Sequence, residues 1–221
     1  MYSACSSDEM AKYAALRKEV VMRQLRGRDI RDTAVLSAMG DVPRHEFLPP
    51  RQRRLAYDDC AVALSSGQTI SQPYIVALMS QLAEIQPGAR VLDIGAGSGY
   101  QSAVLAEMGA EVYAIEILPE LAAAAKERLC RLGDGDVHLR QGDGYAGWPT
   151  AAPFDAILIA AAAPKIPPLL PAQLATGGRL ILPVGEGAQV LQCVHKLAED
   201  KFECRNVSAV QFVPMVGQVR Q

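Results

Sequence analysis

The stretch Val91-Leu92-Asp93-Ile94-Gly95-Ala96-Gly97-Ser98-Gly99-Tyr100 decides the fold of this chain. Its apolar first half predicts a buried strand, and glycines follow at alternate positions. The next residues, 101–108, carry apolar side chains at helical spacing. A strand, a glycine turn and a helix in this order open a nucleotide-type βαβ unit. The sequence therefore predicts an α/β protein with a Rossmann-like, doubly wound and mostly parallel sheet.

The glycines indicate a ligand that lies against bare backbone. Gly95 and Gly97 let the chain turn sharply and leave no side chain in the way, while free N–H groups at the helix start face a carboxylate or phosphate. Glu116 ends the next apolar run about 20 residues beyond the first glycine, where an acid reaches ribose hydroxyls. The spacing is G-x-G-x-G after Asp93, not the dinucleotide spacing G-x-G-x-x-G. This combination favours S-adenosylmethionine as the ligand.

Composition narrows the class of protein. A chain of 221 residues, 50% apolar and 21% charged, is enough for one globular α/β domain and hardly for two. A net charge of −2 gives no electrostatic reason to bind nucleic acid or an anionic membrane. No apolar run approaches a membrane span, and residues 1–5 lack the pattern of a signal peptide. Five scattered cysteines favour reduced cytosolic thiols over disulfides or zinc. We therefore expect a cytoplasmic protein; a monomer is the expected oligomeric state, although the composition does not decide it.

The first 50 residues predict helices and a connector. Two helical patterns occupy residues 8–40, the second after Asp32, a suitable N-cap. Acids are interspersed near the arginines of residues 23–31, which favours a solvated helix face over a basic binding patch. Prolines bar a helix from continuing through residues 41–50. We expect His45, within this connector, to lie on the surface rather than to act as a ligand.

The remaining chain alternates helices and strands before the pattern changes. Pro73 and Pro119 are suited to the first turn of a helix. We expect strands at residues 111–116, 137–140, 154–159 and 179–184, and a short helix at 168–174. Residues 189–197 and 202–213 then predict an antiparallel pair of strands.

Two polar segments allow more than one interpretation. Residues 64–73 are rich in hydroxyl and amide groups, which suits either a simple turn or part of a site. Asp143 follows the third strand and either caps a turn or faces a ligand, because ligands bind at the carboxyl ends of such strands.

Several motifs make the chain similar to the protein-L-isoaspartate O-methyltransferases. The motifs are Gly67–Pro73 (Gly-Gln-Thr-Ile-Ser-Gln-Pro), 93–101, 142–144 and 212–216 (Phe-Val-Pro-Met-Val), together with Val42-Pro43-Arg44 and 161–164 (Ala-Ala-Ala-Pro). The glycine and acid motifs occur in many class I methyltransferases, whereas the loop before Pro73 and the Phe-Val-Pro ending are far more specific. The resemblance runs from about Val20 to the C-terminus.

The resemblance implies methyl transfer from S-adenosylmethionine to the free α-carboxylate of L-isoaspartyl residues in damaged proteins, which starts repair through a succinimide. It implies Ser71 as the active-site hydroxyl, Glu116 on the ribose and Asp143 near the adenine. The cofactor-binding residues that it implies are Asp93, Gly95, Ala96, Gly97, Gly99, Glu116, Ile117, Asp143 and Gly144. The implied substrate-binding residues are Gln68, Thr69, Ile70, Val213, Pro214 and Val216, with no metal ligand.

The implied reaction needs no catalytic base, and the order of the motifs divides the chain into functional parts. A carboxylate with a pKa near 4 is already ionised at pH 7, so the reaction needs no general base. We expect one domain over residues 1–221, with a helical cap (8–60), an acceptor loop and cofactor-binding core (61–185) and antiparallel C-terminal strands (186–221).

Two departures from the family pattern leave alternatives open. The family usually has Leu-Pro-Ile-Gly where this chain has Val62-Ala63-Leu64-Ser65, and commonly threonine at Ala160. The first change alters backbone freedom where the substrate should lie. One alternative is therefore a methyltransferase for a dedicated peptide or a small acid. Another is a cofactor-binding adaptor without turnover, against which the retained Ser71 argues. Nicotinamide-dependent reduction fails on the glycine spacing.

Overall fold

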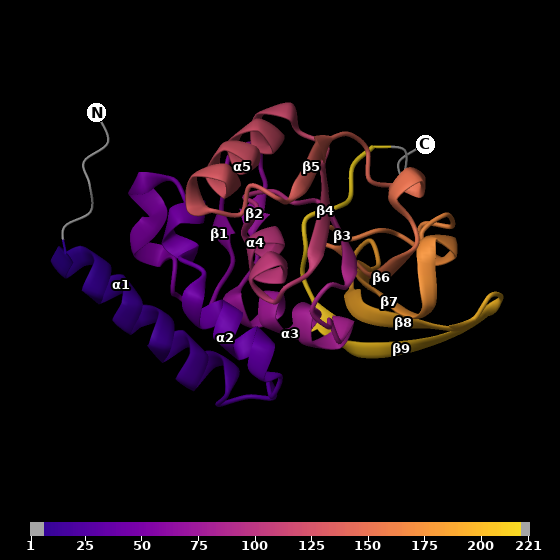
Figure 1. Cartoon of the computed structure of the whole chain (residues 1–221), viewed down its shortest axis with the longest axis horizontal. Helices are drawn as coiled ribbons and strands as arrows, with labels where there is room; N and C mark the ends of the chain where they lie inside the picture. Colours follow the sequence, from indigo (N-terminus) through magenta and orange to yellow (C-terminus); the bar gives the residue numbers. More distant parts are fainter. Residues whose placement is uncertain (1–6, 218–221) are drawn as a thin grey trace.

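The computed structural model describes residues 7–217, in which helices pack against one large sheet (Figure 1). The strands of this sheet are β3 (Arg90–Ile94), β4 (Glu111–Glu116), β5 (His138–Gln141), β6 (Phe154–Ile159), β7 (Leu174–Val184), β8 (Gln189–Ala198) and β9 (Lys201–Val210). Their order is β5-β4-β3-β6-β7-β8-β9, and a separate small hairpin joins β1 (Val62–Ala63) to β2 (Thr69–Ile70). The strands from β5 to β7 pair in parallel, whereas β8 and β9 run antiparallel. The predicted fold class is confirmed.

The helices begin and end largely where capping residues allow. They are α1 (Ser7–Glu19), which continues as a π-helical segment (Val20–Leu25), α2 (Thr33–Asp41), α3 (Pro73–Ala83), α4 (Tyr100–Glu107) and α5 (Pro119–Leu132). The Asp32 carboxylate accepts hydrogen bonds from the N–H groups of Ala34 and Val35, as an N-cap does. Gly133 ends α5 in the left-handed conformation, with φ of 100°.

Alternate residues of the central strands enter two separate cores. Val91 and Leu92 are neighbours in β3 and both are fully buried, but they belong to different clusters of apolar side chains. The cluster around Val91 includes side chains of α1 to α4, and the cluster around Leu92 packs against the segments between β5 and β7. Strand side chains point alternately to the two faces of a sheet, so both faces are covered.

The strand order places a crevice beside β3. From β3 the chain proceeds outward through β4 and β5, then returns to β6 on the other side of β3. The order of the strands therefore reverses between β3 and β6, and ligands of open α/β sheets bind outside the carboxyl ends at such a point. Ile94 and Ile159, which end these two strands, are paired in register.

Several predicted boundaries are wrong for local reasons. No helix spans residues 168–174; a short 3-10 turn covers Pro171–Gln173, because prolines in this segment remove backbone donors. The last strand ends at Val210 instead of residue 213, where the chain leaves the sheet.

The surface position expected for His45 is also wrong. His45 is 1% exposed, and its ring stacks on Tyr13 with the centroids 3.8 Å apart. Its Nδ1 lies 2.7 Å from the Tyr57 hydroxyl. Burial lowers the pKa of His45 to about 4, so the ring is neutral at pH 7. The connector packs against α1, which buries His45 although the polar residues next to it in sequence suggested a surface position.

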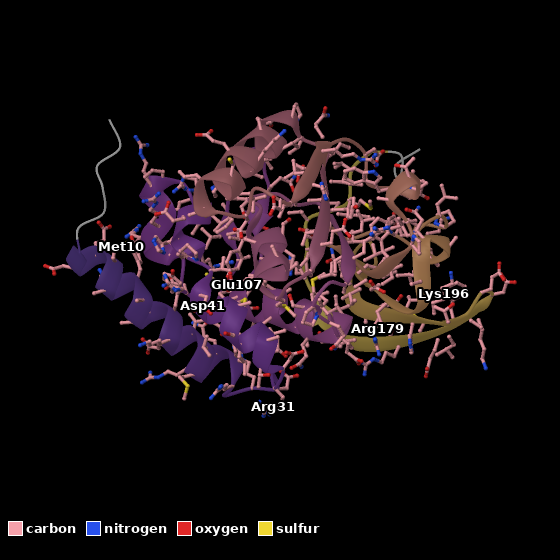
Figure 2. The ribbon with its side chains drawn as sticks, viewed as in Figure 1. Met10, Arg31, Asp41, Glu107, Arg179 and Lys196 are labelled. Atoms are coloured by element: carbon pink, nitrogen blue, oxygen red, sulfur yellow. The ribbon has the colours of Figure 1, made fainter. Side chains whose placement is uncertain are left out.

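The solvated position expected for the arginines of residues 23–31 agrees with the structure. Arg31, like the other arginines of residues 23–31, is exposed (Figure 2). Cys60, Cys130, Cys193 and Cys204 are free thiols. Within residues 7–217 no helix has the length and apolar character needed to cross a membrane, and no cluster of side chains is suited to a metal ion. The expectation about a signal peptide concerns residues 1–5, which lie outside the described residues.

Candidate active site

A pocket lies at the carboxyl ends of β3, β4 and β6, where the strand order reverses. The glycine turn, the loop before α3, the ends of β4 and β6 and the last described residues of the chain all contribute to its wall. The predicted residues that line it are Gln68, Thr69, Ile70, Ser71, Gly95, Ala96, Gly97, Glu116, Ile117, Gly144, Val213, Pro214 and Val216. Segments that are far apart in sequence thus meet in one cavity.

The glycine turn presents bare backbone to this pocket. Gly97 has φ of 54°, a left-handed conformation that favours glycine. A Cβ added to Gly97 would have only the Gly95 carbonyl oxygen, 3.7 Å away, within contact distance. It would therefore project into open space, which is the space that a ligand would occupy. Gly144 has a different reason to lack a side chain, because its Cβ would lie 2.3 Å from Ile94 Cγ2.

Glu116 braces the turn from the end of β4. Its carboxylate is 4% exposed and accepts a hydrogen bond from Gly97 N–H at 2.7 Å and another from Leu118 N–H at 2.9 Å. Each bond goes to a different carboxylate oxygen, and a carboxylate oxygen accepts two hydrogen bonds. Glu116 thus keeps acceptor capacity for a ligand hydroxyl while it holds the turn.

Two predicted cofactor residues, Asp93 and Gly99, are buried behind the pocket wall, and a third, Asp143, is half-buried between the lining residues Gly142 and Gly144. Asp93 is fully buried, and its Oδ2 accepts a 2.5 Å hydrogen bond from the Ser102 hydroxyl. Gly99 packs against α5, where an added Cβ would be 3.4 Å from side-chain atoms. Asp143 caps a turn by accepting a hydrogen bond from Tyr145 N–H at 2.9 Å. Asp93 and Gly99 therefore shape the pocket from the layer behind its wall.

Asp93 is an unusual acid for its position. Its Oδ1 is buried without a hydrogen-bond partner among the described residues. Burial, with a smaller contribution from the nearby Glu116 charge, raises the pKa of Asp93 to about 6 against the opposing effect of the Ser102 hydrogen bond. The turn therefore rests on a carboxylate that titrates close to neutral pH.

The loop before α3 forms the opposite wall. The hairpin of β1 and β2 is closed by hydrogen bonds from Leu64 N–H to the Gln68 carbonyl at 2.7 Å and from Gln68 N–H to the Ser65 carbonyl at 3.1 Å. Ser71 lies between β2 and Pro73, at the start of α3. Thr69 and Ser71 also border a second groove, which continues along Val210 and Phe212. Ser71 thus lies where the cofactor-type pocket and a surface groove meet.

The end of the described chain closes the pocket. Residues 211–216 leave β9 and return to the end of β6, where Ala162 N–H donates to the Val213 carbonyl and Met215 N–H donates to the Ala162 carbonyl. The Gln189 amide holds Phe212 through both of its backbone polar groups. This docking places Val213 and its neighbours in the pocket wall.

The sequence argument missed part of the lining. The missed residues are Val76, Met79, Ile94, Ser98, Tyr100, Gln101, Ile115, Gly142, Ala160, Ala161 and Met215. Gln101 carries the clearest signal, because a polar side chain in the first turn after a glycine loop faces the ligand side. The others are apolar or small, and in sequence such residues are indistinguishable from core.

The charge of the lining distinguishes between cofactors. Among the described residues of the wall, Glu116 is the only carboxylate, and none is Lys, Arg or His. A pyrophosphate would find no cationic side chain there, whereas S-adenosylmethionine brings its own positive sulfonium and ammonium groups. Asp93 behind the turn and Glu116 in the wall both favour a positively charged ligand. The residues present therefore fit S-adenosylmethionine.

This sheet, with its G-x-G-x-G turn and with Glu116 at the end of β4 in the pocket wall, defines a class I S-adenosylmethionine-dependent methyltransferase. The family model for protein-L-isoaspartate(D-aspartate) O-methyltransferase matches residues 16–220. The Rhodopseudomonas palustris protein-L-isoaspartate O-methyltransferase 1 is 49% identical over 213 residues, which cover 96% of this chain and 87% of that protein. The Gloeobacter violaceus relative is 59% identical over 166 residues, or 75% of this chain and 81% of that protein.

Solved structures agree with the sequence comparison. A protein-L-isoaspartate O-methyltransferase structure superposes with a TM-score of 0.82 at 27% identity, over 92% of this chain and 67% of that chain. A Plasmodium falciparum structure of the same description, in complex with S-adenosyl-L-homocysteine, gives 0.78 at 26% identity, over 92% of this chain and 98% of that chain. This chain belongs to the protein-L-isoaspartate(D-aspartate) O-methyltransferase family. It is an enzyme that uses S-adenosylmethionine to methylate isoaspartyl residues in protein repair.

Proposed function

We propose that Ser71 holds the free α-carboxylate of an L-isoaspartyl residue beside the methyl group of S-adenosylmethionine. The position of Ser71 carries this proposal, because this residue borders both the cofactor-type pocket and the groove along Val210 and Phe212. A polypeptide in the groove brings its stray carboxylate to Ser71 without entering the pocket. Gln68, Thr69 and Ile70, with Val213, Pro214 and Val216, form the walls around this meeting point.

The cofactor residues fall into two roles under this proposal. Glu116 accepts hydrogen bonds from the ribose hydroxyls, and Gly95, Ala96 and Gly97 leave backbone against the cofactor. Ile117 and Gly144 line the same wall, on the side we assign to the adenine. Asp143 lies between the lining residues Gly142 and Gly144 and is assigned to the same adenine side, whereas Asp93 and Gly99 support this layer from behind. The division of the chain into a helical cap, a core and C-terminal strands remains part of the proposal.

The chemistry requires positioning more than activation. Bound S-adenosylmethionine supplies a methyl group on a positive sulfonium. A carboxylate is ionised at pH 7 and attacks without losing a proton, so the protein has to align its oxygen with the methyl carbon. Such alignment contributes about 7–11 kcal/mol. Within residues 7–217 no histidine lines the pocket, which agrees with a mechanism without a general base.

The altered hairpin does not favour a different acceptor. Ala63 and Ser65 are exposed and do not line the pocket, and the hairpin is closed by main-chain hydrogen bonds. The φ of Ser65 is not positive, so this position does not need the glycine that the family usually has. The alternative acceptors, a dedicated peptide or a small acid, therefore gain no support from the loop.

The test compares Ser71→Ala with the wild type under single-turnover conditions. Matched isoaspartyl, aspartyl and small-acid acceptors are offered with labelled cofactor. We expect labelling of the isoaspartyl peptide alone, and a loss of about 100-fold in Ser71→Ala, the effect of a reactant displaced by about 1 Å. Affinity for S-adenosylhomocysteine should stay within a few-fold. Ser37→Ala, which removes a hydroxyl from the exposed face of α2, is the control. Preferential labelling of another acceptor, or an unchanged rate in Ser71→Ala, would refute the proposal.

We also propose that the chain acts as a monomer in the cytoplasm without binding nucleic acid. The small net charge of −2 and the free thiols support this assignment. Light scattering after size-exclusion chromatography, cell fractionation and a nucleic-acid binding assay test it. A stable dimer, an exported form or salt-sensitive binding to DNA or RNA would contradict it.

A further inference from the structure

The motif Val42-Pro43-Arg44 contains a side chain that the proposed mechanism does not yet use. Arg44 is 1% exposed and is among the largest fully buried side chains of the protein. Its position follows Pro43, in the connector between α2 and the hairpin. Arginine is almost never buried to this degree unless it is paired, so its placement needs a reason.

The guanidinium of Arg44 binds carbonyl oxygens instead of a carboxylate. Its Nη2 donates to the Ser71 carbonyl at 2.7 Å, and its Nε donates to the Ala56 carbonyl at 2.7 Å. Its Nη1 is buried without a partner, and no ion pair joins Arg44 to an acid within residues 7–217. The positive charge is therefore not neutralised by a side chain of the described structure.

An aromatic ring lies between this charge and the pocket. The Arg44 Cζ atom is 4.9 Å from the centroid of the Tyr100 ring, a cation–π distance, and Tyr100 lines the pocket. Burial raises the pKa of Tyr100 to about 12, so the ring keeps its proton. Ser71 and Tyr100 are thus both pocket residues that contact the same buried cation. Since the described part of the wall contains no Lys or Arg, Arg44 supplies positive charge next to Ser71, on the acceptor side of the pocket.

We propose that Arg44 is a positioning residue for the methyl acceptor, acting through Ser71. Its charge-assisted hydrogen bond fixes the Ser71 backbone at the start of α3, and its unneutralised charge favours a carboxylate on the Ser71 side of the pocket. Glu116 makes the cofactor side of the pocket negative. The cationic cofactor is therefore attracted to the Glu116 wall, and the anionic acceptor is attracted to the wall in front of Arg44. This inference rests on the role proposed above for Ser71.

Arg44→Met and Arg44→Lys together test the inference. Arg44→Met removes the charge and both hydrogen bonds but keeps an apolar stem, and Arg44→Lys keeps the charge and one donor to Ser71. We expect the single-turnover rate with isoaspartyl peptide, at saturating cofactor, to fall about 10- to 100-fold in Arg44→Met, as for a misplaced reactant. KM for the peptide should rise, and Arg44→Lys should restore much of both losses. Affinity for S-adenosylhomocysteine should remain within about 3-fold in both variants.

Arg140→Met is the matched control. Arg140 also donates to one carbonyl, that of Gly147 at 2.8 Å, and lies 4.0 Å from the centroid of the Trp148 ring, but neither it nor these partners line the pocket. A merely structural role for Arg44 predicts that cofactor affinity and acceptor rate fall together, and that Lys is no better than Met. Either result overturns the inference, as does full activity in Arg44→Met. If wild type fails to methylate isoaspartyl peptide, the proposed function fails instead, so the two failures are distinguishable.

Discussion

Because of Asp93, the free energy of unfolding should fall as the pH rises, the opposite of the usual effect of a carboxyl group. Burial raises the pKa of this carboxyl from its ordinary value of 3.8 to about 6. The folded chain therefore holds a proton that the unfolded chain releases between about pH 4 and pH 6. Stability falls with rising pH wherever the folded state binds more protons, so this group stabilises the fold below its ordinary pKa and loses that contribution through pH 6.

The perturbation that isolates this effect is Asp93→Asn, which keeps an oxygen for the Ser102 hydroxyl but does not titrate. At 1.36 kcal/mol per pH unit, the difference between 3.8 and about 6 corresponds to about 3 kcal/mol. The free energy of unfolding of Asp93→Asn minus that of wild type should rise by about this amount from pH 4 to pH 7. Any constant cost of the buried amide cancels in this change.

Urea denaturation at pH 4, 5, 6 and 7 measures the difference, and the thermal midpoints should diverge by about 6–12 °C over the same range. Ser102→Ala is the companion variant, because the Ser102 hydrogen bond lowers the pKa of Asp93 and its loss should move the transition to higher pH. A pH-independent difference between Asp93→Asn and wild type would refute the reasoning.

Two further predictions concern other buried ionisable groups. In Glu116→Ala the turn loses the acceptor of Gly97 N–H and the cofactor loses its ribose contact, a loss of about 1.5–3 kcal/mol. Calorimetry should therefore show that S-adenosylhomocysteine binds about 10- to 150-fold more weakly. Unchanged affinity in a folded variant would remove the ribose assignment. His45 has a pKa lowered by burial to about 4, so its contribution to stability is present above its ordinary pKa of 6.5 and is lost as pH falls toward 4. His45→Phe keeps an aromatic ring stacked on Tyr13 but does not titrate. In an acid titration followed by circular dichroism, this variant should unfold at a lower pH than wild type. The same unfolding midpoint in both proteins would contradict the prediction.

The sequence by itself determined the features that depend on local geometry. The strands around β3, the glycine turn and the starts of α3 and α5 follow from apolar periodicity and from the conformations of Gly and Pro. Gly95 and Gly97 are expected on the ligand side because glycines directly after a buried strand leave bare backbone for a ligand. Motif similarity then indicated the family, and the comparisons confirm it.

Only the tertiary structure decided which of the motif residues face the pocket. Asp93 belongs to a family motif, yet its side chain is fully buried and binds the Ser102 hydroxyl behind the wall, because motif spacing does not specify which way a side chain points. The end of the last strand was equally hidden, since residues 211–213 continue its pattern in the sequence but leave the sheet, and Ala162 N–H binds the Val213 carbonyl at the end of β6.

The contacts between distant segments lay wholly beyond the sequence. Arg44 and Ser71 are 27 residues apart, and their hydrogen bond forms only when the connector and the loop before α3 fold against the same core. His45 is buried for the same reason, because α1 covers it with Tyr13. Composition and periodicity report whether a segment prefers water or a core, but burial of a charged residue depends on the partners that remote segments supply, and those partners exist only in the folded chain.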